Sequence, residues 1–576
     1  ATGTDRSSIV AEPERESNAA LASSAHSVLN STFKILNSEL RPPAVDIHDI
    51  PRFKEDTAIK ELIRTGNTIG CFYVESPAMR MLLKKLKVDD YLGLVAASSI
   101  IRPGVAESGM MREYLLRHND LERRKQAPKE LMDIMPETYG VMVYQEDVLR
   151  VVSQYAGLDL EEADQVRRGM NIRYRDRPEF KLVQKKFFDN CSTKGYPSGQ
   201  PEEVWRQIES FASFSFAKGH SASYAVESYQ SLYLKAHYPL EFMVAVANNF
   251  GGFYRTEFYL HEAKRAGATI EAPCVNRSEE LCSLVDRLSV VSGSVAQASR
   301  AARATGQQPT TDNCIYLGLE NVKSLNTETV QLILIQRRRN GPFTDLEDLL
   351  KRVPLHVEQA RILIRVGALR FTGKSKPALL WELTLLHRPA SVRTDGDLFI
   401  TKVEEPKLPD LHHYPLADAY DELELLGFPL RDPFTMVEYE PAAQLTMVGR
   451  DGRVMGKLPP DNAAPGTCTV DPLGRQAVIA AREMPAHKGK RVTMLGYMIH
   501  VKTTTTNSGS YMSFGSFIDP AGDFWDSTQF PSVAERYPFR GRGVYVLTGY
   551  VEEEFGHYSL RTQHMEKLPW KVDPRY

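Results

Sequence analysis

The sequence has few cysteines, and none of them lies in a metal-binding pattern. Six cysteines occur among 576 residues, with no Cys-x-x-Cys pair and no Cys/His cluster at ligand spacing. This argues against a structural zinc and, because no secretory signal is evident, favours a reducing, cytoplasmic compartment. No apolar run approaches the roughly 20 residues of a membrane-spanning helix. We therefore expect no zinc site and no membrane partner.

The chain also lacks an excess of charge and an obvious set of catalytic carboxylates. Lysine and arginine number 71 against 73 aspartates and glutamates, so any surface for a polyanion must be local. Metal-dependent phosphoryl transfer needs two or three clustered carboxylates. Asp46, Asp49 and the pair Asp89-Asp90 are the only early candidates, and their spacing suits loops and helix caps. No Ser/His/Asp, Cys/His or P-loop pattern is present.

The first two thirds of the chain read as helical. Met79, Leu82, Leu83 and Leu86 fall at helical spacing, as do Val148, Val151, Val152 and Tyr155 before Gly157, and a helix is expected from His220 to Pro239. Two helix–hairpin–helix candidates follow, one leading into a helix capped by Thr327 and one around Gly367. Residues 286–312 and 390–415 have the composition of loops or linkers.

After residue 488 the pattern changes to strands. Expected strands span 492–501, 511–518, 524–530, 544–551 and 557–562, with a short helix at 531–536 between the third and fourth. Three strands, a helix and two strands match the order of an OB-fold barrel, which often binds single strands. The expected fold class is therefore multidomain, mainly α, followed by an all-β OB-fold barrel.

The corner Lys218-Gly219-His220-Ser221 is the most informative motif. It follows an aromatic segment and opens a helix, where backbone N–H groups and the positive end of the helix dipole favour phosphate. Lys218, His220 and Ser221 are therefore candidate contacts for a nucleotide. The alternative is an ordinary helix cap with a solvated lysine.

A basic run behind Arg167 and Arg168 is a second candidate. Residues 165–186 contain eight basic and two acidic side chains, Arg173 and Arg175 among the basic ones. Such a patch suits a phosphate backbone, although a solvated helical face would look the same. Arg102, before a Pro-Gly turn, is a third candidate for a phosphate contact or a structural turn.

The hairpins and the barrel supply candidate DNA contacts. Hairpin glycines let backbone N–H groups approach phosphates, but Ser324 and Asn326 replace them in the first hairpin, so this pair is at least partly scaffold. The hairpin candidates are Lys323, Asn326, Arg338, Gly367, Arg370 and Lys374. In the barrel Tyr511, Phe514 and Trp525 can stack on unpaired bases or fill the core.

A short linker segment is a candidate anchor for a protein partner. Asp395 to Phe399 places Leu398 and Phe399 together in a polar stretch. Such a pair can insert into a pocket of a partner, but it also arises by chance. The segment alone is weak support for an interaction.

An ordered series of motifs resembles one known family. It includes Phe72-Tyr73-Val74-Glu75-Ser76, Arg102-Pro103-Gly104, Glu137-Thr138-Tyr139-Gly140-Val141-Met142-Val143-Tyr144-Gln145-Glu146, Arg167-Arg168-Gly169-Met170, the corner at Lys218, Lys235-Ala236-His237-Tyr238-Pro239 and Leu426-Gly427-Phe428. The series resembles the C-terminal half of the bacterial DNA polymerase III alpha subunit, the C-family replicative polymerase. The resemblance is strongest over residues 46–255 and looser in the barrel.

The resemblance implies a domain plan. It predicts a lead and palm remnant at 1–45, fingers at 46–300, tandem helix–hairpin–helix and clamp-binding elements at 301–390, a linker at 391–487 and an OB-fold at 488–576. It places Arg102, Arg167, Arg168, Lys218 and His220 near the incoming deoxynucleoside triphosphate. The family's clamp-binding peptide corresponds in position to Asp395–Phe399, which lacks the usual glutamine.

The resemblance also implies function and partners. The expected ligands are primer-template DNA, single-stranded template, deoxynucleotides, the sliding clamp and other replicase subunits. The family's Mg²⁺-binding aspartates would lie upstream, so we expect this chain to lack them, to be a fragment or half of a split enzyme, and to be inactive alone. The alternatives are a non-catalytic DNA-binding accessory protein and the error-prone branch of the family, which acts in DNA repair.

Overall fold

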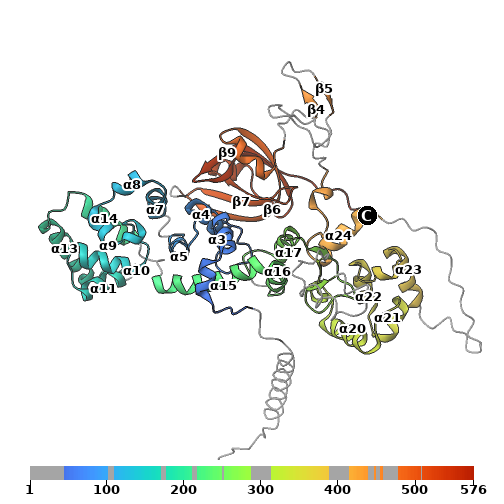
Figure 1. Cartoon of the computed structure of the whole chain (residues 1–576). Helices are drawn as coiled ribbons and strands as arrows, with labels where there is room; N and C mark the ends of the chain where they lie inside the picture. The colour runs from blue at the N-terminus through green and yellow to red at the C-terminus, as the bar shows by residue number, and fades with distance from the viewer. Residues whose placement is uncertain are drawn as a thin grey trace, which may run out of the picture. The chain divides into compact units, whose positions relative to one another are not determined.

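A computed structural model describes residues 45–101, 109–169, 177–210, 217–249, 252–286, 313–387, 414–438, 446–448, 454–457, 478–506 and 509–575 (Figure 1). The chain divides into two compact units, residues 1–53 and 54–576. In the first unit, Asp46 accepts a hydrogen bond from the backbone N–H of His48 (2.9 Å) and Asp49 from that of Arg52 (3.2 Å). Both aspartates thus act as local turn and cap residues there.

The second unit begins with a series of helices. They are α3 (Thr57–Thr65), α4 (Pro77–Leu86), α5 (Tyr91–Ile100), α7 (Met110–Asn119), α8 (Leu121–Lys125), α9 (Lys129–Ile134), α10 (Gln145–Arg150), α11 (Leu160–Gly169), α13 (Pro178–Thr193), α14 (Gln200–Ser210), α15 (Lys218–His237), α16 (Pro239–Asn248) and α17 (Thr256–Arg265); α2 (Ile50–Glu55) precedes them. Side-chain caps fix the N-termini of three of these helices. Asp56, Ser76 and Asp90 accept hydrogen bonds from backbone N–H groups in the first turns of α3, α4 and α5. The predicted stripe at 148–155 is buried, and its second half is a π-helical turn, Val151–Tyr155.

A small sheet separates these helices from the hairpin region. Strands β1 (Thr269–Glu271), β2 (Ser283–Asp286) and β3 (Asn313–Tyr316) are ordered β1-β3-β2, with β1 parallel to β3 and β2 antiparallel to it. The sequence patterns did not predict this sheet. Its strands are short, and the central one pairs with segments that precede it by about 30 and 45 residues.

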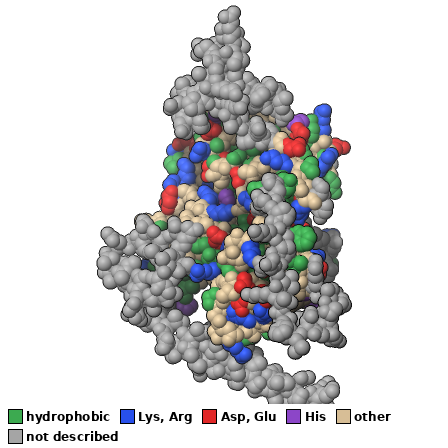
Figure 2. Space-filling model, turned by 90° about the vertical axis from the view of Figure 1, so that its right-hand side faces the viewer, with side chains coloured by type: hydrophobic (Ala, Val, Ile, Leu, Met, Phe, Trp, Pro, Cys, Tyr) green, Lys and Arg blue, Asp and Glu red, His purple; other side chains and the backbone are tan. Residues whose placement is uncertain are grey.

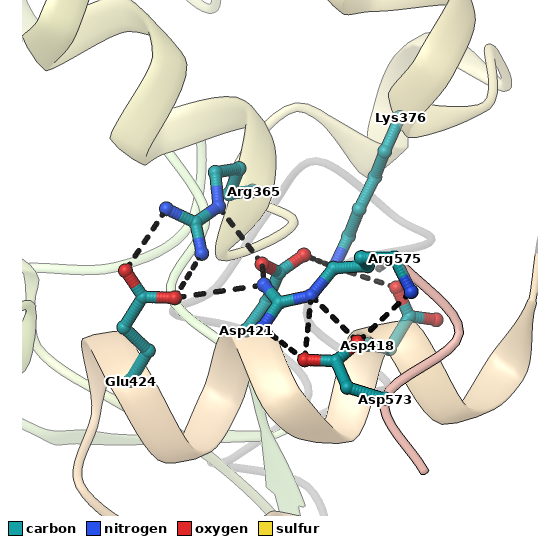
Figure 3. A network of polar contacts seen from close by, with 7 residues as sticks. All are labelled: Arg365, Lys376, Asp418, Asp421, Glu424, Asp573 and Arg575. Carbon is teal, nitrogen blue, oxygen red and sulfur yellow. Dashed lines mark hydrogen bonds and ion pairs between the residues drawn. The ribbon is translucent and has the colours of Figure 1, made fainter.

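The hairpin region contains the predicted helices. Helix α20 (Thr327–Asn340) begins one residue earlier than predicted, because Asn326 and not Thr327 is its N-cap residue. Helices α21 (Leu346–Arg352), α22 (Val357–Arg365) and α23 (Lys376–Leu386) follow. Ser375 caps α23. Helix α24 (Pro415–Leu425) is tied to α22, α23 and the chain end by a charged network of Asp418, Asp421, Glu424, Arg365, Lys376, Asp573 and Arg575 (Figure 3).

The C-terminal strands close into a five-stranded barrel, as predicted. Strands β6 (Arg491–Thr505), β7 (Tyr511–Ile518), β8 (Phe524–Gln529), β9 (Val544–Glu554) and β10 (His557–Lys567) run in the order β10-β8-β7-β6-β9, with α25 (Pro531–Arg536) between β8 and β9. The helical region followed by this barrel confirms the expected fold class. A further strand pair, β4 (Thr446–Val448) and β5 (Val454–Lys457), is antiparallel.

One hydrophobic core joins the helices to the outside of the barrel. It runs from α16 and α17 through α20–α23 to side chains of β6 and β9, among them Leu495, Tyr497 and Val546. A second core fills the barrel interior around Phe517, Trp525 and Tyr545. The outer face of the barrel therefore packs against helices of the second unit through this core.

Candidate nucleic-acid interface

Helix α15 begins at the predicted Lys218 corner and has no cap from its own N-cap residue, Ala217. Instead the backbone N–H of Lys218 donates to both carboxylate oxygens of Glu146, at 3.0 and 3.2 Å. Glu146 lies on α10. An anionic group from a distant helix thus occupies the position that a phosphate would take at this helix N-terminus.

The Lys218 side chain is partly exposed and points to the segment before α10. Its ammonium group forms an ion pair with Glu137 and lies 5.5 Å from the ring centroid of Tyr144. Its side chain is one third exposed. The lysine is therefore accessible from one side and neutralised by a carboxylate from the other.

An aromatic cluster of His220, Tyr224, Phe72 and Tyr73 lies on the same end of α15. The ring of Tyr224 is 4.2 Å from His220, 5.4 Å from Phe72 and 4.8 Å from Tyr73, measured between centroids. Phe72 is 42% exposed, and Tyr73 adopts a left-handed φ of 65°. Such a strained backbone is kept only where neighbours hold it.

Two serines of α15 hold the loop that presents Phe72. The hydroxyl of Ser228 donates to the Phe72 carbonyl (3.0 Å), and the Phe72 N–H donates to the Ser231 hydroxyl (3.1 Å). The aromatic cluster is therefore a rigid, half-open face beside Lys218. Phe72 and Tyr73 did not enter the predicted site, because their approach to Tyr224 spans about 150 residues of sequence.

Ser221 is a correction to the predicted set. It is 1% exposed and its hydroxyl accepts a hydrogen bond from Ser99 of α5 at 2.7 Å. On a helix, the residue after His220 points about 100° away, here into the packing between α5 and α15. Ser221 therefore joins α15 to α5 and is buried away from solvent.

Arg167 and Arg168 lie together at the end of α11. Both pair with Asp164, at 2.8 and 2.7 Å, and the hydrogen bond from Arg167 is the main cause that lowers the pKa of that carboxyl. Arg168 is two thirds exposed. Arg102, Arg173 and Arg175 lie outside the described residues. Of the predicted arginines in the finger region, the structure therefore describes Arg167 and Arg168.

In the first hairpin, the left-handed position is Ser324, with φ of 64°, whereas Asn326 has φ of −73° and precedes α20. The Asn326 N–H donates to Gln359 (2.8 Å), whose amide donates back to the Ser324 carbonyl (2.9 Å). The Gln359 side chain therefore already accepts the hydrogen bond of the Asn326 N–H, which a bound phosphate would need. This arrangement supports the expectation that the first hairpin is partly scaffold.

The other hairpin candidates differ in how they are engaged. The Arg370 guanidinium donates to the Pro273 carbonyl (2.8 Å) and pairs with Glu271 (3.1 Å), so it fastens β1 to the second hairpin. Two candidates are exposed, namely Arg338, paired with Glu279, and Lys374, paired with Glu382. Gly367 has a left-handed φ of 82°, and its backbone N–H donates to the Ile364 carbonyl (3.0 Å). The backbone N–H of Lys323 donates to Leu425 at 2.7 Å.

The barrel presents two of the three predicted aromatic residues. Tyr511 and Phe514 of β7 are 66% and 40% exposed. Trp525 is a correction, since it is 3% exposed and stacks on Phe517 in the barrel core with ring centroids 4.6 Å apart. A ring enclosed in this way cannot stack on a base. Phe530, just after β8, is 45% exposed and was not predicted.

The described residues present neither a metal-binding cluster nor a membrane-spanning helix. No three His, Cys, Asp or Glu side chains there come together in a way that can hold a metal ion. Within the same ranges, no helix is long and apolar enough to cross a membrane. On the face drawn in Figure 2, basic side chains lie among acidic ones and form no large patch of one sign. The predicted clamp segment, Asp395, Leu398 and Phe399, lies outside the described residues.

Comparison with known proteins finds similarity to two family models and to a set of curated relatives. Residues 25–195 match the finger domain of the bacterial DNA polymerase III alpha subunit, and residues 267–379 match a helix-hairpin-helix motif. The chain is therefore similar to bacterial DNA polymerase III alpha subunits in its finger region and carries a matching helix-hairpin-helix motif. Alpha subunits of Staphylococcus aureus strain Mu50 and Aquifex aeolicus are 29% and 30% identical over 391 and 387 residues.

The two alignments each cover 67% of this chain but 34% and 30% of the respective relatives. The chain thus spans about a third of the length of the curated alpha subunits it matches. The matched finger region contains Arg167 and Arg168, and the helix-hairpin-helix match contains both hairpins.

Proposed function

We propose that this chain is a nucleotide- and DNA-contacting part of a bacterial replicative DNA polymerase, a DNA-directed nucleotidyltransferase of the cytoplasm. The observation that carries the proposal is the start of α15. There Lys218 and an N-terminal N–H group face carboxylates next to a rigid aromatic cluster. The spatial combination of cationic, dipolar and aromatic groups suits the triphosphate and base of an incoming deoxynucleotide.

The contribution of these residues to nucleotidyl transfer would be positioning and neutralisation of charge. Lys218 would bind the triphosphate, His220 and Tyr224 would contact the sugar or base, and Arg167 and Arg168 would face phosphates of nucleotide or primer-template. Arg102 is proposed for the same surface. Polymerases of this family use divalent metal ions, but the described residues offer no fitting ligand set, and no step through a metal is assigned to them.

Further contacts extend along the chain in this proposal. Tyr511 and Phe514 would stack on single-stranded template, and the exposed hairpin candidates would meet duplex backbone. Asp395, Leu398 and Phe399 would engage the sliding clamp, and other replicase subunits would join. The domain limits at residues 45, 300, 390 and 487 belong to the same proposal.

Primer extension tests the proposal most directly. The chain would be assayed with Mg²⁺, primer-template and deoxynucleotides, alone and after mixing with a separately expressed polymerase palm domain of this family. We expect no synthesis by the chain alone and template-directed synthesis in the mixture. Tight DNA binding with no synthesis in the mixture would contradict the proposal and indicate a DNA-binding accessory protein.

A further inference from the structure

A small cavity lies where α4 of the helical part meets one end of the barrel. Its volume is about 180 Å³, and its walls come from α4, the 3₁₀ segment Ala481–His487, β8 and the start of β10. We call it the α4–barrel cavity. Pockets for drug-sized ligands measure roughly 300–1,000 Å³, so this cavity suits a single small group.

Three cationic side chains line the α4–barrel cavity. Arg80 and Lys84 stand four residues apart on α4, and Arg482 belongs to the 3₁₀ segment Ala481–His487. Neither the Lys84 nor the Arg482 side chain makes an ion pair or hydrogen bond within the described residues. Like charges at this helical spacing repel each other. Burial and the neighbouring Arg80 lower the pKa of Lys84, although Asp526 opposes this shift.

The remaining polar groups of the cavity do not cancel this charge. Asp526 is its only carboxylate, and it already accepts a hydrogen bond from Ser516 (2.6 Å). His557 lies 3.7 Å from Asp526, and burial lowers its pKa to about 4, so it is neutral near pH 7. The indole N–H of Trp525, 97% buried in the cavity wall, has no hydrogen-bond partner among the described residues.

We propose that the α4–barrel cavity binds a phosphate group, held by Lys84, Arg80 and Arg482. A compact tetrahedral anion matches the volume and supplies acceptors for Lys84 and Arg482, whose side chains have none within the described residues. Arg80 is already oriented, because its Nε donates to the Gly66 carbonyl (2.8 Å) and its guanidinium lies 5.0 Å from the Phe524 ring centroid.

The geometry of the barrel indicates where such a phosphate can come from. Ser516 pairs with Asp526 in the β7–β8 register, and exposed Phe514 lies two residues along β7 from Ser516. Two residues of a strand span about 7 Å. A single strand stacked on Phe514 therefore brings its backbone near the cavity. The other source of the same chemistry is a free phosphorylated compound.

The first arm of the test uses inorganic phosphate and the full chain. Thermal unfolding would be followed against phosphate concentration at constant ionic strength for wild type, Lys84→Gln and Arg482→Gln. Lys129→Gln is the control, because it removes the same charge from an exposed position on α9. We expect a saturable rise in Tm for wild type and the control, and at least a tenfold weaker response in the two cavity variants.

Folding of the variants can be checked in the same experiment. Without phosphate, Lys84→Gln should unfold at the wild-type temperature or above it, since repulsion with Arg80 is removed. Arg482 is exposed, so its replacement tests the site with little risk to folding. If both cavity variants respond to phosphate as Lys129→Gln does, the proposal is overturned.

The second arm uses a short oligothymidylate and rests on the proposed function. The slope of log K against log salt should fall by about 0.7 for each lost phosphate contact to a single strand. A smaller slope in Lys84→Gln, but not in Lys129→Gln, supports DNA as the source. An unchanged slope with a positive phosphate arm supports a free phosphorylated ligand. If wild type binds no oligonucleotide, the proposed function fails while the phosphate arm still decides the cavity.

Discussion

Lys218 and Glu137 form an ion pair between residues 81 positions apart, at the position proposed for the triphosphate. A nucleotide bound there has to displace the Glu137 carboxylate, because both anions compete for one ammonium group. Glu146 acts on the backbone N–H of the same residue and adds to this competition. The ion pair therefore lowers the affinity of Lys218 for a nucleotide and also fixes the position of its side chain.

Replacing Glu137 with glutamine should tighten nucleotide binding, and replacing Lys218 with alanine should weaken it. An exposed ion pair is worth up to about 1 kcal/mol, so Glu137→Gln should gain up to about fivefold in affinity. For Lys218→Ala we expect a loss of about tenfold or more, because a charge-assisted contact to phosphate disappears. Titration of the full chain with a fluorescent deoxynucleoside triphosphate measures both.

Glu122→Gln is a suitable control for this pair of variants. It removes the same charge from a surface ion pair with Lys125 (2.7 Å) on α8. Its affinity should equal that of wild type. Unchanged affinity in Lys218→Ala would remove that lysine from the proposed site, and weaker binding in Glu137→Gln would mean that the carboxylate orients Lys218 and does not compete.

Among the secondary-structure elements, those with local signals could be predicted from the sequence. The start of α23 follows from Ser375 and Pro377, and the five barrel strands follow from alternation and intervening turns. The sheet β1-β3-β2 could not be predicted, because its strands have three or four residues and pair over long separations. Local pattern does not encode such pairings.

In the candidate site, too, features encoded by neighbouring residues could be predicted, and contacts between distant segments could not. The helix start at Lys218 was predictable, but its carboxylate partners and the ring contacts of Tyr73 depend on tertiary folding. The prediction that Trp525 stacks on an unpaired base was wrong for a different reason. In β8 alternate residues face opposite sides, and sequence alone does not say which side is the barrel interior, since a shift of one residue exchanges them.

Helix α24 provides a test of how elements are joined. It presents Asp418, Asp421 and Glu424 to its neighbours, and Asp421 is 5% exposed between Arg365 of α22 (2.8 Å) and Arg575 (2.6 Å) (Figure 3). Replacing Asp421 with alanine leaves two guanidinium groups without their shared carboxylate. We expect a loss of about 3–5 kcal/mol in the free energy of unfolding, measured with urea.

Glu424→Gln is the matched comparison for Asp421→Ala. Glu424 pairs with Arg365 in the same network, but its side chain is half exposed, so water replaces the lost contact. Its loss should be below about 1 kcal/mol. Equal and small losses in both variants would show that burial of Asp421 adds nothing to the joint between α22, α24 and the chain end.

For the second unit as a whole, the decisive feature is the shared core between the helices and the barrel wall. Glu257 of α17 lies at this contact beside Tyr497 of β6, with its carboxylate 3.7 Å from Arg542. Burial raises the pKa of Glu257, although Tyr497 and Arg542 oppose the rise, and its Oε2 accepts no hydrogen bond from the described residues. A charged group at this position weakens the attachment of the barrel.

The stability of the second unit should therefore depend on pH through Glu257. Below the ordinary carboxyl pKa both the folded and the unfolded chain hold the proton. As pH rises, the unfolded chain releases it first, so the folded state loses stability until its own raised pKa is passed. Glu257→Gln keeps the neutral form at every pH. Its Tm should match wild type near about pH 5 and exceed it by roughly 2 °C or more near about pH 7.5.

Thermal unfolding at both pH values measures this difference, with Glu241→Gln, an exposed position on α16, as the control that should show no change in the gap. The competing expectation is that the Arg542–Glu257 ion pair outweighs the cost of burial. In that case Glu257→Gln would be less stable than wild type at the higher pH, because Arg542 would lose its carboxylate neighbour. The sign of the Tm difference at the higher pH therefore decides whether the helical part and the barrel are joined chiefly by apolar packing or by charge.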